Sequence, residues 1–445
     1  MPASRTRLTI LCHGYPPAIG GEERWTAELA RRLARQHGFR VTVITTYAKN
    51  AYHFVDPRQP RLECPPDEDD GDVRIIRCPV INWLAPALRP VQALSYRTHL
   101  PGNGLLRTLW QGPISPSMLK HLADHRYDDV WYATPFPLLH LYYPFLIPGR
   151  PPLVLKGSVH PNDRWGYERP GLIRLARRAE CLVGNTKAEE IWAVDHGVDP
   201  GRVAIIPPGV DPDSFKVARG ALRHRLGLEE GMLLITYMGQ FGEHKGIDTL
   251  IEAWAPIHQR IHKSHLVIAG ASTPYLARIT KLIESCAAAA SITVLADISE
   301  EVKRSLLADS DIFASPSRAE SFGITVIEAW AAGCVVVSGR TTGTAQVVED
   351  GVDGILVEPD QPQDLSAALL SLALQPERRR VLAEAAHRHV LERYRIDQVV
   401  DRYASLLRAV AAGRPPGRFA PDDATTTRQS ASPTAEDGAY AAPEA

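Results

Sequence analysis

The sequence contains no apolar run long enough to span a membrane. A bilayer-spanning helix needs about 20 predominantly apolar residues, so we expect none here. The most apolar segment, residues 135–147, contains three prolines and His140, and we interpret it as a buried helix. The apolar run that follows Arg5 and Arg7 ends at Cys12, which is too short for a signal peptide. We therefore expect a cytoplasmic protein and leave open a peripheral contact with the inner face of the membrane.

The cysteines lack CxxC spacing, and the charges nearly cancel to a formal net charge of −1. Scattered cysteines in apolar runs predict buried free thiols in a reducing compartment, rather than a disulfide framework or a zinc site. A chain that is nearly neutral overall is not drawn to nucleic acid, so we expect no nucleic-acid partner. The cysteines are Cys12, Cys64, Cys78, Cys181, Cys286 and Cys334.

What the sequence does contain is a repeated alternation of short apolar runs and amphipathic helices. Apolar runs without polar alternation predict strands buried on both faces, as in parallel sheets. The first set of predicted strands covers residues 8–12, 41–46, 74–80, 128–134, 152–158, 180–185 and 203–208. The second set covers residues 233–239, 265–270, 292–296, 311–317, 334–339 and 354–359. Two such sets predict an α/β protein with two Rossmann-like, doubly wound domains.

The length of 445 residues fits two domains of about 180–210 residues and a tail. We predict an N-terminal domain over residues 1–215 and a C-terminal domain over residues 216–395. Residues 396–411 are predicted to form a helix. Residues 412–445 are rich in Pro, Ala, Ser and Thr and are predicted to be a disordered tail. The acidic, proline-rich segment 56–72 is expected to be a solvated insertion.

Residues 316–339 place two glutamates around the start of a predicted helix. Glu320 lies in the loop after a predicted strand, and Glu328 lies on the helix that opens near Gly323. Free backbone N–H groups at a helix start bind a diphosphate, and a glycine there lets the ligand approach closely. The two glutamates are separated by roughly 12 Å at 1.5 Å per residue, which suits a ribose at one end and a hexose at the other. The alternative is a pair of solvated glutamates, although Glu328 lies in an apolar run.

Three further residues follow strand ends, where ligands bind in open α/β sheets. Lys245 follows a glycine-containing loop and can neutralise a phosphate as a point charge. The alternative is a surface lysine. Gly21 lies in a glycine-rich loop at the start of the first helix, where a plain turn is the alternative. His160 lies just past a strand end, facing the expected cleft between the domains, and the alternative is a structural histidine.

The order and spacing of these motifs resemble the retaining nucleotide-sugar glycosyltransferases of family 4. Members have the GT-B fold, in which two Rossmann-like domains face each other across a cleft. The resemblance covers about residues 7–411, and its strongest element is the E-x7-E motif formed by Glu320 and Glu328. Further matching stretches are AIGGEERWTAELARRLA, IPPGVDPDSF, GQFGEHKGID and DGVDGILVEP.

The resemblance implies an enzyme that moves a hexosyl group, with retention, from a nucleotide-diphosphate sugar such as a UDP- or GDP-hexose. The acceptor would be a hydroxyl of a sugar, a glycolipid or a small molecule, bound by the N-terminal domain. The C-terminal domain would hold the donor, and the helix 396–411 would cross back to the N-terminal domain. Neither a metal ion nor another cofactor is implied.

The resemblance also implies a role for each candidate residue. Lys245 would contact the donor diphosphate, Glu320 would bind the transferred sugar, and Glu328 would hold the ribose. His160 would lie near the reacting sugar, and Gly21 would let the N-terminal loop close on the donor. The backbone amides that would cap the phosphates are those near Phe322, Gly323 and Ile324.

One departure from the family pattern bears on activity. Gln240 stands where the family usually has an arginine beside the diphosphate, and this change removes a cation from the leaving group. Arg318 is a candidate replacement. A noncatalytic nucleotide-sugar-binding protein is therefore the alternative function.

Another candidate contact is a group of arginines within residues 168–180, which can meet an anionic lipid headgroup. A solvated helix face is the alternative. The arginines are Arg169, Arg174, Arg177 and Arg178.

Overall fold

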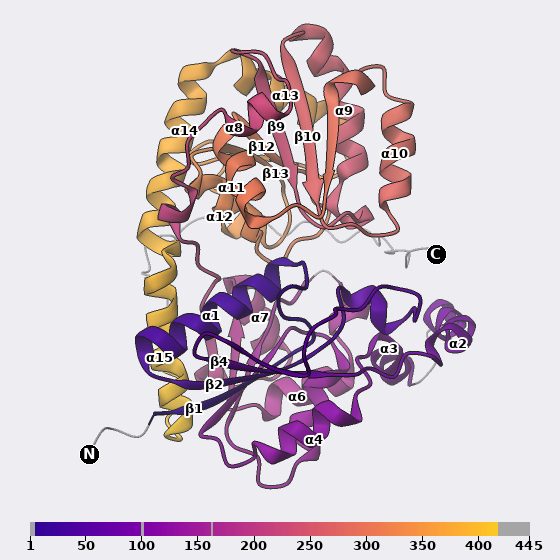
Figure 1. Ribbon diagram of the computed structural model, residues 1–445, viewed down its shortest axis with the longest axis vertical. Coiled ribbons are helices and arrows are strands. Elements are labelled where there is room, and N and C mark those ends of the chain that lie inside the picture. The colour runs from indigo at the N-terminus through magenta and orange to yellow at the C-terminus, as the bar shows by residue number, and fades with distance from the viewer. Residues whose placement is uncertain (1–4, 99–101, 162, 417–445) are drawn as a thin grey trace.

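The computed structural model describes residues 5–98, 102–161 and 163–416, which form two α/β units, one above the other (Figure 1). The sheet of the first unit has the strand order β3-β4-β2-β1-β5-β6-β7-β8, and that of the second has the order β11-β10-β9-β12-β13-β14. Every neighbouring pair of these strands is parallel except β3 and β4. The prediction of two Rossmann-like α/β units is confirmed.

Apart from the acidic edge strand β3, the first unit is built on strands that are almost wholly buried, as their apolar sequences predict. Its strands are β1 (Arg7–Cys12), β2 (Arg40–Thr46), β3 (Asp67–Asp70), β4 (Val73–Cys78), β5 (Val130–Thr134), β6 (Leu153–Lys156), β7 (Cys181–Gly184) and β8 (Val203–Ile205). Its helices are α1 (Gly21–His37), α2 (Ala85–Thr98), α3 (Asn103–Gln111), α4 (Pro116–Asp124), α5 (Arg164–Tyr167), α6 (Pro170–Arg178) and α7 (Lys187–Asp195). Helix α1 packs Trp25, Leu29 and Leu33 into the core, because these residues share one helix face.

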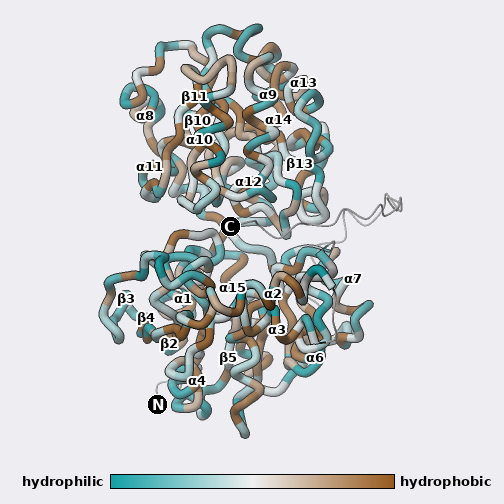
Figure 2. The backbone as a smooth tube through the Cα atoms, turned by 90° about the vertical axis from the view of Figure 1, so that its right-hand side faces the viewer, coloured by the Kyte–Doolittle hydropathy of each residue, from teal (hydrophilic) through white to brown (hydrophobic). Residues whose placement is uncertain are grey.

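The second unit repeats the arrangement, and apolar segments again concentrate in its interior (Figure 2). Its strands are β9 (Leu233–Met238), β10 (Ser264–Gly270), β11 (Ile292–Ala296), β12 (Ile312–Ser315), β13 (Val335–Gly339) and β14 (Ile355–Val357). Its helices are α8 (Ala221–Arg225), α9 (Ile247–Arg260), α10 (Leu276–Glu284), α11 (Glu300–Asp309), α12 (Ile324–Ala331), α13 (Pro362–Leu374) and α14 (Pro376–His389).

The chain passes between the units twice, and the two passages are hydrogen-bonded to each other. The backbone N–H of Val210 donates to the carbonyl oxygen of Tyr394 at 2.8 Å, and that of Ile396 donates to the carbonyl oxygen of Val210 at 2.9 Å. Helix α15 (Ile396–Ala411) then packs Val399 and Tyr403 into the core of the first unit. The C-terminal helix therefore returns to the N-terminal sheet (Figure 1).

The acidic segment 56–72 differs from its prediction, because it is not simply a solvated insertion. It contains β3, which pairs antiparallel with β4. The acidic side chains of β3 meet arginines: Asp67 pairs with Arg74, and Glu68 pairs with the buried Arg77 at 2.6 Å. Cross-strand pairs of opposite charge stabilise this edge strand although it has no apolar residue.

Other predictions concern the apolar segment, the cysteines and the tail. Residues 135–147 contain a 3₁₀ helix, Leu139–Leu146, with His140 fully buried. All six cysteines are unpaired, and four are buried, whereas Cys64 and Cys286 are half-buried. No helix in the described parts of the chain is long and apolar enough to cross a membrane. Residues 417–445 of the predicted disordered tail lie outside the described residues.

Candidate active site

The loops at the carboxyl ends of the two sheets meet where the units touch. A Cβ atom placed on Gly21, at the start of α1, would lie 3.5 Å from Cδ1 of Ile324, the first residue of α12. The backbone N–H of Ala188 in α7 donates to Oε1 of Gln346 in the second unit at 3.1 Å. In parallel α/β sheets this end is the ligand-binding edge. The candidate residues of both units are therefore brought together.

Lys245 and Glu320 form the ion pair at the centre of this region. Lys245 ends a short 3₁₀ turn after β9, and Glu320 lies in the loop between β12 and α12. The Nζ and Oε2 atoms are 2.6 Å apart, and each side chain is 18% exposed. Burial raises the pKa of Glu320, but the Lys245 ammonium outweighs it, so the pKa lies below its usual value. Glu320 is consequently an ionised carboxylate in a partly dry place.

Two glycines let the loops that carry this pair approach closely. Gly246 adopts φ +65°, and a Cβ atom there would lie 2.0 Å from the carbonyl oxygen of Pro316. A Cβ atom on Gly343 would lie 2.4 Å from the carbonyl oxygen of Glu320. The N–H of Gly343 instead donates to that oxygen at 3.2 Å. Side chains at these positions would displace the ion pair.

The start of α12 lies next to this ion pair. Gly323 precedes the helix with φ +93°, a conformation that favours glycine. The Phe322 side chain is buried and packs edge-on against Tyr394, with ring centroids 5.6 Å apart. Ile324 packs against the cores of both units. Phe322 therefore offers a ligand only its backbone amide, at a helix terminus that carries partial positive charge.

Glu328, on α12, is paired with a lysine that the sequence reasoning missed. Its carboxylate meets the ammonium of Lys303 on α11, whose side chain is only 3% exposed. Lys303 also lies 2.9 Å from Glu300, and Glu300 pairs across the units with Arg24 of α1 at 2.6 Å. A signal for Lys303 exists in the sequence, because it shares helical spacing with the buried Leu306 and Leu307 of α11.

Two histidines flank the Lys245–Glu320 pair. Burial lowers the pKa of His160, and the Lys245 ammonium lowers it further, while the Glu320 carboxylate acts in the opposite direction. The net pKa lies below its usual value, so the imidazole is neutral at neutral pH. His244, which the sequence reasoning did not single out, has its pKa lowered to about 3 by burial and by the adjacent Lys245. His160 comes from the first unit and His244 from the second. The ion pair is thus bordered by uncharged imidazoles from both sides.

The proposed substitute for the missing arginine is engaged elsewhere. Gln240 is exposed, just after β9. Arg318 pairs with Asp248 at 3.0 Å and with Asp360. It also donates to the carbonyl oxygen of Glu243. Since two carboxylates already neutralise this guanidinium, Arg318 is not available to a diphosphate, and its candidacy is not supported.

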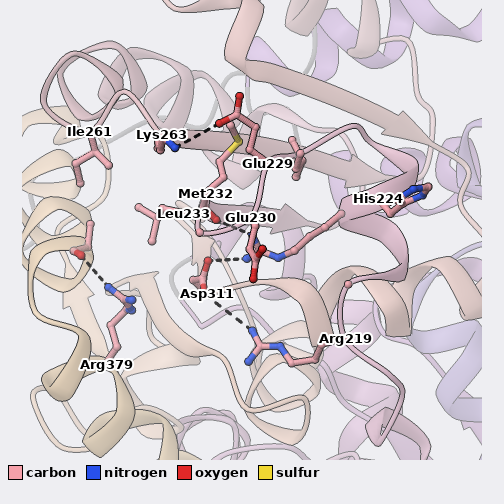
Figure 3. A pocket seen from close by; sticks show the side chains of 15 residues that line it. Arg219, His224, Glu229, Glu230, Met232, Leu233, Ile261, Lys263, Asp311 and Arg379 are labelled. Carbon is pink, nitrogen blue, oxygen red and sulfur yellow. Dashed lines mark hydrogen bonds and ion pairs between the residues drawn. The ribbon is translucent and has the colours of Figure 1, made fainter.

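One hollow lies at the opposite end of the second sheet (Figure 3). It measures about 880 Å³ and lies beside Leu233, where β9 begins. Arg223 pairs there with Asp311 at 2.7 Å. The hollow is remote from the strand carboxyl ends, so we do not assign it to the site. Within the described residues, no group of three or more His, Cys, Asp or Glu side chains is placed to hold a metal ion.

Comparison with known proteins identifies the family. The family described as Glycosyltransferase Family 4 matches residues 19–214, and the one described as Glycosyl transferases group 1 matches residues 219–389. The chain therefore belongs to the family 4 glycosyltransferases and has the GT-B fold.

Two curated relatives illustrate the range of similarity. A D-inositol 3-phosphate glycosyltransferase of Rhodococcus jostii is 32% identical over 259 residues, which is 56% of this chain and 57% of the relative. The match thus spans little more than half of that relative's length. A GDP-mannose-dependent alpha-(1-6)-phosphatidylinositol monomannoside mannosyltransferase of Mycobacterium tuberculosis is 24% identical, over 92% of this chain and 100% of the relative.

Solved structures share the fold at low identity. Anabaena HepE, in complex with UDP and glucose, superposes with a TM-score of 0.69 at 18% identity, covering 91% of this chain and 100% of HepE. Sucrose-phosphate synthase from Thermosynechococcus elongatus superposes with a TM-score of 0.71 at 19% identity, covering 92% of this chain and 100% of the synthase.

Proposed function

We propose that this chain transfers a hexosyl group, with retention, from a nucleotide-diphosphate sugar to a hydroxyl of a sugar, glycolipid or small molecule. The observation that carries the proposal is the Lys245–Glu320 pair beside the N-terminus of α12. An ammonium and a helix N-terminus together favour a diphosphate, and a carboxylate favours the positive charge that develops on a sugar ring.

In this proposal the donor lies along the second unit. Lys245 and the backbone amides of Phe322, Gly323 and Ile324 hold the diphosphate. Glu328 accepts hydrogen bonds from the ribose hydroxyls, and Lys303 holds its carboxylate in place. Residues 216–395 form the donor domain, while residues 1–215 with the helix 396–411 form the acceptor domain. Gly21 leaves room for the N-terminal loop to close over the donor.

The reaction breaks the bond between the anomeric carbon and the diphosphate oxygen. Negative charge builds on that oxygen, where Lys245 and the dipole of α12 stabilise it. The ionised carboxylate of Glu320 stabilises the positive charge on the oxocarbenium-like sugar. The departing phosphate oxygen takes the proton of the acceptor hydroxyl as the new glycosidic bond forms, so the scheme needs no separate strong base. In this scheme neutral His160 hydrogen-bonds the reacting sugar. The scheme uses protein charges in place of a metal ion, so we propose a metal-independent reaction without a cofactor.

The relatives support the donor class. The mycobacterial relative is named for its dependence on GDP-mannose, and HepE was crystallised with UDP and glucose. Both curated relatives carry inositol-containing acceptors in their names, so D-inositol 3-phosphate and phosphatidylinositol mannosides are reasonable first acceptors to test. The six unpaired cysteines fit a cytoplasmic location.

A noncatalytic nucleotide-sugar-binding protein is the second candidate, favoured by one observation. Because Gln240 stands where the family usually has an arginine, the leaving diphosphate has one cation fewer beside it. Arg318 does not replace that cation, since it pairs with Asp248 and Asp360. Thermal shift with UDP-, GDP- and ADP-hexoses, followed by nucleotide release with and without acceptors, separates the two functions. Release of nucleotide with an α-linked product from an α-linked donor supports retaining transfer. Stabilisation by a donor without release, across the acceptor panel, supports the binding protein.

A further inference from the structure

The loop that carries His160 contains a strained residue. Ser158 adopts φ +74°, a left-handed conformation that costs free energy in a residue other than glycine. The residue before it, Gly157, still follows the sheet, because its N–H donates to the carbonyl oxygen of Val183 at 2.7 Å. We call residues 157–160 the His160 loop. A strained conformation persists only where neighbouring groups hold it, so this turn needs an anchor.

The anchor is the side chain of Glu189, the third residue of α7. Its Oε2 atom accepts hydrogen bonds from the backbone N–H groups of Ser158, at 2.9 Å, and Val159, at 3.1 Å. Its Oε1 atom accepts a hydrogen bond from the N–H of Asn185 at 3.1 Å. Glu189 is 2% exposed, so its carboxylate is closed off from a ligand in the cleft. Both oxygens are engaged with the backbone, and they join the His160 loop to the start of α7.

The backbone fits closely around this carboxylate. A Cβ atom on Gly157 would lie 2.6 Å from Oε2 of Glu189, and one on Gly184 would lie 3.0 Å from Cβ of Glu189. The Val159 side chain is buried in the core of the first unit. Val159 is therefore held by its side chain and by its N–H group, and the next residue, His160, begins from a fixed point.

The far side of the His160 loop is also supported. The rings of His160 and Tyr167 have centroids 5.4 Å apart, and Tyr167 is buried. The backbone N–H of Asp163 donates to the carbonyl oxygen of His160 at 2.9 Å. These contacts support the ring and the backbone of His160, whereas Glu189 fixes the strained turn from which the ring projects.

We propose that Glu189 is a positioning residue for sugar transfer, which holds the His160 loop so that the imidazole faces the Lys245–Glu320 pair. The inference rests on the proposed function, because it takes from it the role of His160 at the reacting sugar. Glu189 touches no substrate in this scheme and acts only through the backbone that it binds. A positioning residue of this kind should affect the reaction step more than the binding of the donor, which the second unit holds.

Glu189→Gln tests the proposal with a side chain of almost the same size. Whichever way the amide turns, its NH₂ group meets a backbone N–H, so at least one hydrogen bond is lost. We expect kcat to fall about 10- to 100-fold, as for a small misplacement of a reacting group, with the donor KM within about threefold. The matched control is Glu190→Gln, at the next residue of α7, which pairs with the exposed Lys187 at 2.7 Å and should retain both constants.

A double-mutant cycle with His160→Ala separates positioning from a general effect on the fold. If Glu189 acts through His160, adding Glu189→Gln to His160→Ala should change kcat by less than about twofold. Glu189→Asp, which keeps the charge but is one methylene shorter, replaces Glu189→Gln if that variant does not fold. An unchanged kcat in the single variant, or full additivity of the two losses, overturns the proposal.

Titration of the His160 imidazole by NMR, with His160→Gln to identify its signal, does not depend on transfer. In the unaltered chain the pKa should lie below its ordinary value of 6.5, because the ring is buried. In Glu189→Gln the released loop admits water, so the pKa should rise toward 6.5, while Glu320, Lys245 and Asp163 still face the ring in both chains. An unaltered chain without turnover would count against the proposed function, and this titration would then decide alone: an unchanged pKa overturns the positioning role.

Discussion

The Nζ atom of Lys245 lies 2.6 Å from Oε2 of Glu320, and the two residues follow neighbouring strands of one sheet, β9 and β12. Each charge is therefore largely shielded from water, and each depends on the other. The Ser317 hydroxyl donates to the same carboxylate oxygen at 3.3 Å. Removing Lys245 would leave the buried Glu320 carboxylate without its cation.

The stability of Lys245→Ala should depend on pH in a defined direction. In the unaltered chain the pKa of Glu320 lies below its ordinary value of 4.5. The ionised carboxylate therefore stabilises the folded chain above about pH 4.5, and this stabilisation is lost as the pH falls through the pKa of the folded state. In the variant, burial acts without the ammonium and raises the pKa of Glu320, so folding is penalised increasingly above about pH 4.5. The melting temperatures of the two proteins should be close near about pH 4 and should separate by a few degrees at about pH 7. A constant gap across this range would contradict the assignment.

The strands of both sheets were predictable because parallel strands buried on both faces are unbroken apolar runs, as in β5 and β9. Strand β3 was not, because arginines on another strand stabilise its acidic residues. The partner of Glu328 was not predicted either, since Lys303 lies on a different helix.

Glu328→Gln should weaken donor binding more than catalysis. Its carboxylate is assigned to the ribose, which does not change charge during the reaction. Losing charge-assisted hydrogen bonds should raise the donor KM about 10- to 100-fold and leave kcat within about threefold. Initial rates over a range of donor concentrations measure both constants. A large fall in kcat with an unchanged KM would move Glu328 to the reacting centre.

Lys303→Met should destabilise the second unit, because it leaves the Glu328 carboxylate without its buried cation. We expect a loss of about 3 kcal/mol, in the range measured for broken buried pairs. Combining it with Glu328→Gln should recover part of this loss, since no unpaired charge remains. Urea denaturation of the single and double variants measures the coupling, and additive losses would show that the two side chains act independently.

Gln240→Arg should strengthen donor binding by restoring a cation beside the diphosphate. The position is exposed, so the gain should be modest, about fivefold, and should shrink as salt is added. Thermal shift against donor concentration at two ionic strengths measures it. Lys263→Arg, a change at an exposed lysine far from the site, is the control and should leave donor affinity unchanged. A gain that persists at high salt would point to a structural effect instead.

The most direct test of the central claim is the rate of nucleotide release from the preferred donor in three chains: unaltered, Lys245→Ala and Glu320→Gln. If Lys245 stabilises the leaving diphosphate and Glu320 the sugar cation, each variant should lose about 10²–10³ in turnover, as with the loss of a donor to an oxyanion. Lys263→Ala, at an exposed lysine, should retain full turnover. An undiminished rate in Lys245→Ala, with the protein folded, would contradict the account.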